Sequence, residues 1–138
     1  MSGVFIATMV SLFTFMTPAQ AAAGKCGSSS TGWSFCLYYN SGELGSYYRW
    51  TNSGEVSNLA GLTYPNNGNG NGAGQAVKNN SASASYYNAS GCDACSNDYV
   101  RVFFSSGFLG NYDTIYTNQN KNLVNTYNNN ASWRAYFL

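Results

Sequence analysis

The 138-residue chain contains no histidine and few charged residues of either sign. Without histidine it lacks the commonest general base and the usual nitrogen ligand of zinc. Charged residues make up 8% of the chain and the formal net charge is +1, so no basic footprint for nucleic acid or an anionic membrane is expected. Glu and Lys are scarce whereas aromatic residues reach 17%, which disfavours helix and favours strand. The polar surface must therefore come mainly from Asn, Ser, Gly and Tyr, which suits contact with peptide backbone or sugars.

The carboxylates give little support for catalysis. Asp93 and Asp98 are close enough in sequence to act as the two acids of a glycosidase, but both lie on or beside one loop and no second acidic cluster exists. We therefore expect no catalytic residues and no enzyme activity. Asp98 and Arg101 are expected to form a weak surface pair or to bracket a turn.

The first 23 residues resemble an export signal rather than part of a domain. Residues 4–16 are apolar apart from small hydroxyl residues, Pro18 breaks a helix, and the small residues at 19–23 suit a signal peptidase. The apolar stretch is too short to span a bilayer. Export signals usually begin with positive charge, but no Lys or Arg precedes Lys25. We expect a secreted, extracellular protein whose remaining residues, 24–138, form one domain.

The chain repeats itself on either side of a Gly/Asn-rich stretch. The run at 37–47 returns at 102–112, the pair Asn58-Leu59 returns at 122–123, and the segment 79–83 returns at 128–132. Within the first run five residues recur identically, namely Ser41, Gly42, Leu44, Gly45 and Tyr47 as Ser106, Gly107, Leu109, Gly110 and Tyr112. Three blocks in the same order indicate duplication of one supersecondary unit that is too small to bury a core alone.

Each repeat is predicted to form short antiparallel strands. The alternating or continuous apolar runs at 33–39 and 99–104 predict the first strand of each unit, with turns at 40–42 and 105–107. Further strands are expected at 46–51 and 111–117 and at 82–87 and 132–138, and Asn58 and Asn122 are expected to begin a short third element. Strands at this spacing predict an all-β sandwich with almost no helix.

One segment has no counterpart in the second unit. Residues 62–75 contain an Asn/Gly run at 66–72 and show no apolar periodicity. We expect this insertion to be a mobile surface loop.

Four cysteines lie in the exported part, and the even number predicts two disulfides. Three pairings are open. We favour Cys26 with Cys36 and Cys92 with Cys95, because each pair is local and lies next to the first strand of one unit. The second bridge closes too small a loop to stabilise the fold much, so it is better explained as a device that shapes a loop. A reduced redox pair needs a helix after Cys92, and no helical pattern follows it.

The repeat resembles the Greek key of the βγ-crystallin family. The signature of that family is an aromatic residue, a second aromatic five positions on, and a glycine two positions later. Phe103, Phe108 and Gly110 match it fully, whereas in the first unit Glu43 stands between Tyr38 and Gly45 where the second aromatic belongs. The resemblance implies a two-key, internally duplicated sandwich, with the first key at about 33–88 and the second at about 98–138.

Within this superfamily the chain is similar to secreted bacterial peptidase inhibitors of thermolysin-type zinc metalloproteases. The resemblance rests on Cys26, Cys36, the Ala-Ser-Ala segment at 82–84 and a short cysteine loop before the second key. It implies an inhibitory loop formed by Cys92, Asp93, Ala94 and Cys95, with the reactive bond after Cys92. Asp93 differs from the large apolar residue that those proteases prefer, so the class of the target protease stays open.

The same family often carries paired Asn or Asp followed by hydroxyl residues near the end of each key. The segments 79–83 and 128–132 resemble this motif. They offer weak calcium candidates at Asn79, Asn80, Ser83, Asn128, Asn129 and Ser132. Asn and Ser are more often turn formers, because their side chains bond their own backbone. We expect no intrinsic cofactor and at most weak calcium binding through neutral ligands.

The function expected first is inhibition of an extracellular protease by a monomeric protein. The alternative is an extracellular glycan-binding or structural module, because aromatic rings offer flat apolar faces to sugars and amides bind their hydroxyls. Neither function involves nucleic acid, or a membrane once the signal is removed. The aromatic candidates for glycan contact are Tyr39, Tyr47, Tyr48 and Trp50.

Overall fold

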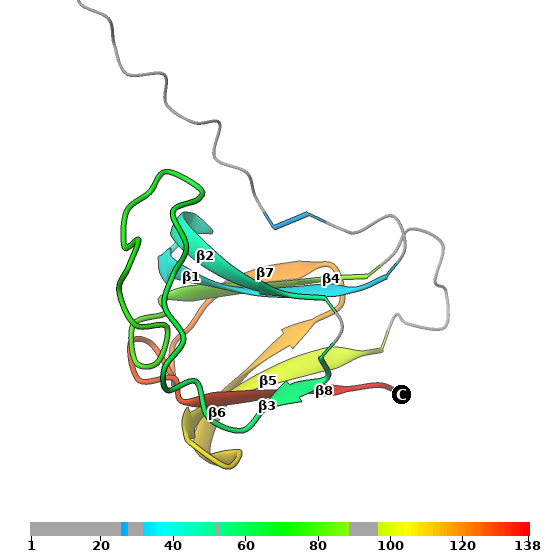
Figure 1. The fold of residues 1–138 in the computed structure, drawn as a ribbon. Helices are drawn as coiled ribbons and strands as arrows, with labels where there is room; N and C mark the ends of the chain where they lie inside the picture. The colour runs from blue at the N-terminus through cyan, green and yellow to red at the C-terminus, as the bar shows by residue number, and fades with distance from the viewer. Residues whose placement is uncertain (1–25, 28–31, 52, 89–96) are drawn as a thin grey trace, which may run out of the picture.

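The computed structural model describes residues 26–27, 32–51, 53–88 and 97–138, and these residues contain eight strands and no helix. The first sheet has the strand order β2-β1-β4-β7 and the second has the order β3-β8-β5-β6, with antiparallel pairing throughout (Figure 1). The all-β prediction is therefore confirmed. The strands are β1 (Ser34–Asn40), β2 (Leu44–Trp50), β3 (Glu55–Val56), β4 (Ser83–Tyr87), β5 (Tyr99–Ser105), β6 (Leu109–Tyr116), β7 (Gln119–Asn122) and β8 (Ser132–Tyr136).

Each sheet contains one tight hairpin, β1-β2 or β5-β6. Gly42 and Gly107 occupy the same place in the two turns, with φ of 71° and 73°, a region that glycine enters without steric cost. The residues that follow them, Glu43 and Phe108, also have positive φ. Both hairpins shift register at the end of the first strand, between Tyr38 and Asn40 and between Phe103 and Ser105.

The third strand of each unit lies in the sheet of the other unit. β3 pairs with β8, and β7 pairs with β4. Our expectation that Asn58 and Asn122 begin this element is wrong, because β3 ends at Val56 and β7 ends at Asn122. Leu59 and Leu123 instead follow the strands and are buried. Leu59 donates its backbone N–H to the carbonyl of Ala131, just before β8, and Leu123 donates to that of Ala82, just before β4.

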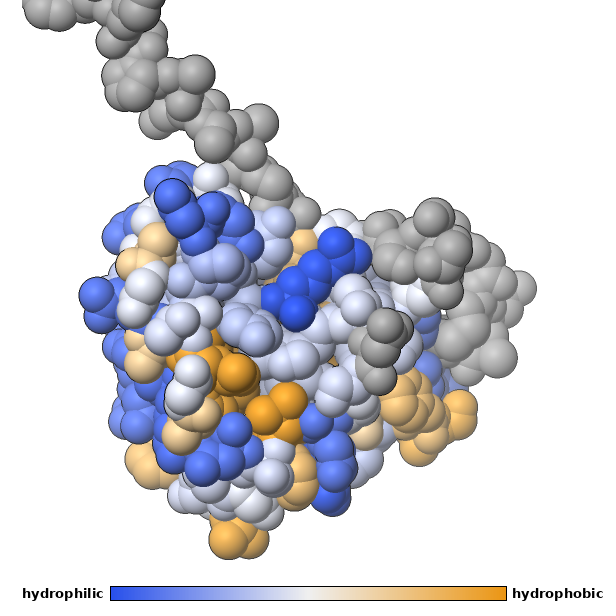
Figure 2. Space-filling model, viewed as in Figure 1, coloured by the Kyte–Doolittle hydropathy of each residue, from blue (hydrophilic) through white to orange (hydrophobic). Residues whose placement is uncertain are grey.

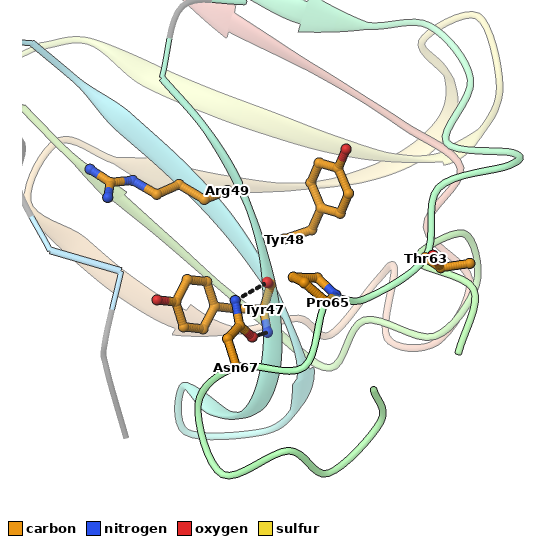
Figure 3. Close-up of a pocket in the computed structure, with 6 residues that line it drawn as sticks. All are labelled: Tyr47, Tyr48, Arg49, Thr63, Pro65 and Asn67. Carbon is orange, nitrogen blue, oxygen red and sulfur yellow. Dashed lines mark hydrogen bonds between the residues drawn. The ribbon is translucent and has the colours of Figure 1, made fainter. Parts of the chain in front are cut away.

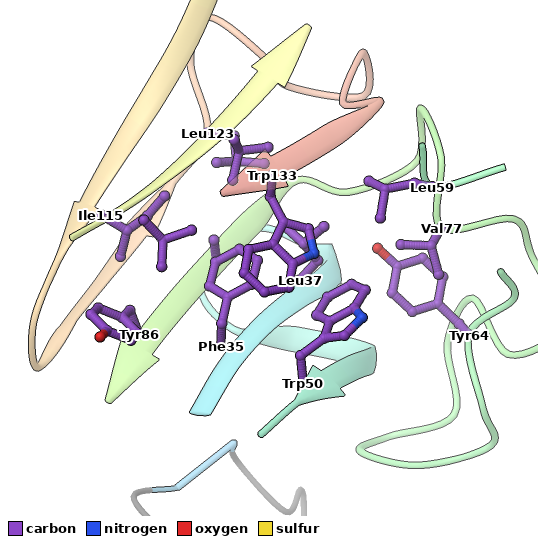
Figure 4. Close-up of a cluster of buried hydrophobic side chains, with 13 residues drawn as sticks. Phe35, Leu37, Trp50, Leu59, Tyr64, Val77, Tyr86, Ile115, Leu123 and Trp133 are labelled. Carbon is purple, nitrogen blue, oxygen red and sulfur yellow. The ribbon is translucent and has the colours of Figure 1, made fainter. Parts of the chain in front are cut away.

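The core lies between the two sheets and is rich in aromatic residues (Figure 4). Trp133 of β8 is fully buried, with its ring centroid 4.7 Å from that of Phe35 and 5.2 Å from that of Trp50, both of the first sheet. Val100 and Val102 of β5 complete the same cluster. Large apolar side chains from both sheets thus remove a continuous apolar surface from water, which is the main favourable term in folding.

The insertion at 62–75 is fixed to the edge of β2, so our expectation of a mobile loop is not met. The carbonyl of Asn71 accepts a hydrogen bond from the backbone N–H of Ser46 at 2.7 Å. The Asn67 amide accepts from the N–H of Tyr47 and donates to its carbonyl, at 2.8 and 3.0 Å. Gly72 lies against the ring of Tyr39 so closely that a Cβ there would overlap the ring. The Asn/Gly run at 66–72, whose backbone has high conformational freedom, is therefore held in place by backbone and side-chain amide hydrogen bonds.

No helix in the described ranges has the length and apolar character needed to cross a membrane. In the view of Figure 2 the hydrophobic residues form separate groups among neutral and hydrophilic ones. The exposed large hydrophobic residues include two at equivalent hairpin positions, Leu44 and Leu109.

Candidate functional site

The serines of the two calcium candidates hold the hairpins. Ser83 donates to the Asn40 carbonyl at 2.6 Å and accepts from the N–H of Glu43 at 3.0 Å. Ser132 makes the same two bonds in the second unit, to the Ser105 carbonyl at 2.7 Å and from the Phe108 N–H at 3.1 Å. Both hydroxyl groups are buried, and each bonds a hairpin distant in sequence rather than its own local backbone as we expected.

The asparagine segments of the two candidates lie next to each other. Asn79 donates its N–H to the Asn130 carbonyl at 2.8 Å, and Asn128 donates to the Ser81 carbonyl at 3.0 Å. The side-chain amides of Asn80 and Asn129 donate to nearby backbone carbonyls. Within the described ranges no three acidic or cysteine side chains gather as a metal group. Weak calcium binding therefore stays a prediction, and the contacts observed are those of turns.

A buried carboxylate organises the outer side of the first sheet. Glu43 is 7% exposed, and its carboxylate accepts hydrogen bonds from Tyr38 at 3.4 Å, Tyr87 at 3.1 Å and the Asn120 amide at 2.7 Å. All three donors are neutral, and Tyr38 is also hydrogen-bonded to Ser85 at 3.0 Å. The Glu43 carboxylate is thus satisfied by internal hydrogen bonds.

The disulfide between Cys26 and Cys36 is confirmed, and it covers this same side. Cys36 alternates in β1 with the inward side chains of Phe35 and Leu37, so it points outward and brings Cys26 onto the outer side of the sheet. Cys26 is 1% exposed and donates its N–H to the Tyr38 hydroxyl at 3.1 Å. The outer side of the first sheet is therefore closed around Tyr38.

The four aromatic residues that we selected for glycan contact do not form one surface. Trp50 lies in the core, and Tyr39 and Tyr48 pack against it. A shallow hollow does lie beside Tyr47 and Tyr48, between β2 and the insertion (Figure 3). The two rings lie on opposite sides of β2 there, because neighbouring residues of a strand face opposite ways. This hollow spans a sheet edge and offers no pair of parallel aromatic surfaces.

A different aromatic surface lies on the outer side of the second sheet, and we name it the tyrosine face. Its residues alternate along their strands with inward, buried residues such as Val100, Ile115 and Trp133, so they point away from the core. The strand register places Tyr99 of β5 between Tyr116 of β6 and Tyr136 of β8. The tyrosine face consists of Tyr99, Tyr112, Tyr116, Tyr136 and Arg101.

The rings of the tyrosine face contact each other across the strands. Tyr99 and Tyr136 are stacked, with ring centroids 4.8 Å apart and an interplanar angle of 16°. Tyr99 and Tyr116 meet edge to face at 5.9 Å. The guanidinium carbon of Arg101 lies 4.3 Å from the ring centroid of Tyr112 and 5.2 Å from those of Tyr99 and Tyr136. Such cation–π contacts hold the five side chains as one ordered surface.

The hydroxyl groups of the tyrosine face differ from those of several tyrosines elsewhere in the protein. Tyr38, Tyr64 and Tyr87 donate to internal acceptors, and burial raises the pKa of each of these hydroxyl groups above its ordinary value. The four hydroxyl groups of the tyrosine face make no hydrogen bond to any described residue. Tyr112 and Tyr116 are 41% and 54% exposed. Their hydroxyl groups are therefore available to an external ligand.

The expected pair of Asp98 and Arg101 does not form. Asp98 is buried and accepts from the backbone N–H of Leu138 at 3.0 Å, and its carbonyl accepts from Thr117. Arg101 lies three positions further along the chain, in β5, and points to the tyrosine face. Successive side chains of an extended strand alternate between its two sides, so residues three positions apart point to opposite sides.

Several expectations fall on residues outside the described ranges. They include the proposed signal at 1–23, the disulfide between Cys92 and Cys95, and the inhibitory residues Asp93 and Ala94. The described residues neither support nor oppose protease inhibition.

The tyrosine face was missed by our sequence analysis although its signal is readable. In the strands of the second unit, these residues stand at alternating positions: Tyr99 lies two positions before Arg101, and Tyr112 lies four positions before Tyr116. This alternation places the residues on one side of a sheet. The contact of Tyr136 with Tyr99 could not be predicted from this spacing, because it depends on the pairing of β8 with β5.

Comparisons of the chain with family models, curated proteins and solved structures give no match. Inferences on function therefore depend on the residues of this chain and their geometry.

Proposed function

We propose that this protein is an extracellular glycan-binding module and that the tyrosine face is its contact surface. The observation that carries the proposal is the grouping of four outward tyrosines whose hydroxyl groups have no partner among the described residues. A tyrosine offers an apolar ring and a hydroxyl that both donates and accepts, which matches the mixed apolar and hydroxyl character of a sugar.

The surface is also ordered before any ligand binds. The side chains of the tyrosine face come from three adjacent hydrogen-bonded strands and contact each other at ring distances of 4.8 to 5.9 Å. Tyrosine has few rotatable bonds, so little conformational entropy is lost when such a surface meets a ligand. A compatible location is outside the cell, because the disulfide between Cys26 and Cys36 needs an oxidising environment.

The proposal includes the duplicated two-key fold of the βγ-crystallin kind, and the strand order supports it. Adding four to each strand number of β2-β1-β4 gives β6-β5-β8, and β7 and β3 occupy equivalent edges. The hydrogen bonds of Ser83 and Ser132 to the two hairpins are equivalent as well. In this fold the third strand of each key completes the sheet of the other, so neither key exposes its core.

The test is retention of the protein on immobilised polysaccharides, with cellulose, chitin and dextran as neutral members and polygalacturonate as an acidic one. We expect retention on at least one polymer, and an affinity at least about tenfold lower for the double variant Tyr112→Ala/Tyr116→Ala. Tyr127→Ala is the matched control, because Tyr127 is 47% exposed but lies in the connection between β7 and β8.

Two results would contradict the proposal. One is the absence of retention on every polymer, and the other is unchanged retention of the double variant in its folded state. Inhibition of a protease by a protein that no glycan retains would favour the inhibitor expectation instead.

A further inference from the structure

Arg101 occupies the middle of the tyrosine face and has no acidic partner among the described residues. The four described carboxylates are engaged elsewhere: Glu43 with Tyr38, Tyr87 and Asn120, Glu55 with Arg134, Asp98 with the N–H of Leu138, and Asp113 with Thr126 and Lys121. The other arginine of this sheet side, Arg134, has its Nε 2.7 Å from a carboxylate oxygen of Glu55. Arg101 is thus a guanidinium held by rings alone.

The nitrogen atoms of Arg101 differ in their surroundings. Its Nε is buried and has no hydrogen-bond partner in the described part of the protein. The two Nη atoms also make no hydrogen bond to a described residue. Unlike Nε, they are not fully buried. A ligand oxygen therefore reaches the two Nη atoms rather than the Nε side, and a carboxylate binds that end with two parallel hydrogen bonds.

The ring orientations favour the same kind of ligand. Tyr99 and Tyr136 are stacked at 16°, so these two rings cover each other's facing surfaces, and the guanidinium of Arg101 lies over Tyr112 at 4.3 Å. Ring or guanidinium contacts thereby cover part of the negative faces of Tyr99, Tyr112 and Tyr136. Ring edges carry positive partial charge, and hydroxyl groups donate hydrogen bonds. Edges, hydroxyl groups and a permanent cation together complement an anion better than they complement a neutral sugar.

We propose that the tyrosine face binds a polysaccharide of uronic acids, with a sugar carboxylate on the Nη atoms of Arg101 and neighbouring sugar hydroxyls on the tyrosine hydroxyls. This inference rests on the proposed glycan-binding function and adds the chemical class of the glycan. The guanidinium of Arg101 supplies the positive charge of this site.

The test compares polygalacturonate with its methyl ester, which has the same sugar ring but no charge on the carboxyl group. We expect the native protein to bind the acid form at least about tenfold more tightly at about 0.15 M salt, where weak long-range attraction is screened. Arg101→Gln should remove this preference, and Arg101→Lys should retain part of it because charge remains but the two-pronged geometry is lost.

Arg49→Gln is the matched control, because Arg49 is an exposed arginine of the first sheet and the change in net charge is the same. We expect it to alter the affinity for polygalacturonate by less than about twofold. Thermal unfolding of each variant shows that the fold is intact, and Arg101→Lys keeps the test informative if Arg101→Gln fails to fold.

The outcomes separate the two proposals. Equal affinity for the acid and the ester, with binding lost in the double tyrosine variant, overturns the uronic-acid inference and leaves glycan binding in place. Equal loss in Arg101→Gln and Arg49→Gln shows a general charge effect and also overturns the inference. Absence of binding to every polymer overturns both.

Discussion

The outer sides of the two sheets differ although their hairpins are built alike. On the first sheet, Cys26 lies over Cys36, and Glu43 ties together the hydroxyl groups of Tyr38 and Tyr87. The equivalent hairpin position on the second sheet is Phe108, whose ring packs on Phe103 and carries Arg134 at 3.8 Å. One side is closed by internal hydrogen bonds and a disulfide, and the other presents the tyrosine face.

The residues that form the hairpins are shared by the two sheets, whereas residues that determine the chemistry of each outer side are not. The hairpin glycines with positive φ and the serines that bond the hairpins are the same in both units. Outward positions differ: Cys36 of β1, paired with Arg49, corresponds to Arg101 of β5, paired with Thr114. Two hairpins with the same turns can thus differ in the chemistry of their outward positions.

The largest expected effect concerns the inward sides, which also differ. Trp133 is fully buried, whereas Ala84 occupies the corresponding place in β4, paired with Leu37 of β1 as Trp133 is paired with Val102 of β5. Trp133→Ala should lower the free energy of unfolding by about 3–5 kcal/mol, because the cavity cannot be refilled by its rigid aromatic neighbours. Urea denaturation measures the loss.

The control for this change is Tyr127→Ala, which removes an exposed ring and should cost less than about 0.5 kcal/mol. A loss below about 1 kcal/mol in Trp133→Ala would show that the core does not depend on the second unit's large residue.

A smaller effect is expected from exchanging the two residues that differ at the hairpin. Glu43→Phe leaves the Tyr87 hydroxyl and the Asn120 amide without their acceptor, so we expect a loss of about 2–3 kcal/mol in urea denaturation. Phe108→Glu should cost about 1 kcal/mol, because the position is half-buried and Arg134 lies next to the new carboxylate. Equal losses in the two variants would mean that the closed and open sides do not differ in their internal hydrogen bonding.

The smallest effect on the free energy of unfolding is expected when the hydroxyl group of a buried tyrosine is removed. The Tyr86 hydroxyl is buried and has no partner in the described ranges, whereas the Tyr64 hydroxyl donates to Ser81 at 2.7 Å. Tyr86→Phe should leave the free energy of unfolding unchanged or raise it by up to about 1 kcal/mol, and Tyr64→Phe should lower it by about 1 kcal/mol. A loss in Tyr86→Phe as large as that in Tyr64→Phe would contradict the assignment of an unpaired hydroxyl.

The same tyrosine gives a pH test. Burial raises the pKa of Tyr86 to about 12, with a further contribution from Asp98. Because the unfolded chain ionises this phenol near pH 10, the stability is complete below that pH and falls as the pH rises towards 12. The decline measured by urea denaturation at several pH values should be smaller in Tyr86→Phe.

The sequence predicted the local elements well because short-range patterns determine them. The strands at 34–40 and 99–105 follow from alternating apolar residues, and the hairpins follow from Gly42 and Gly107. The local bridge between Cys26 and Cys36 was predicted from spacing for the same reason. The tyrosine face and the closed cluster of Glu43 depend on which strands pair, and pairing is decided by packing between distant segments. The insertion was misjudged because amide side chains can replace strand hydrogen bonds, which composition alone does not reveal.

The attachment of the insertion to β2 has a consequence for how this protein behaves at high concentration. An edge strand with free backbone N–H and C=O groups is a template for pairing with the next molecule, the first step towards fibrous aggregates. Asn67 and Asn71 take up the groups of Ser46 and Tyr47 that such a neighbour would use. The insertion therefore blocks this edge of the first sheet from pairing with a strand of another molecule.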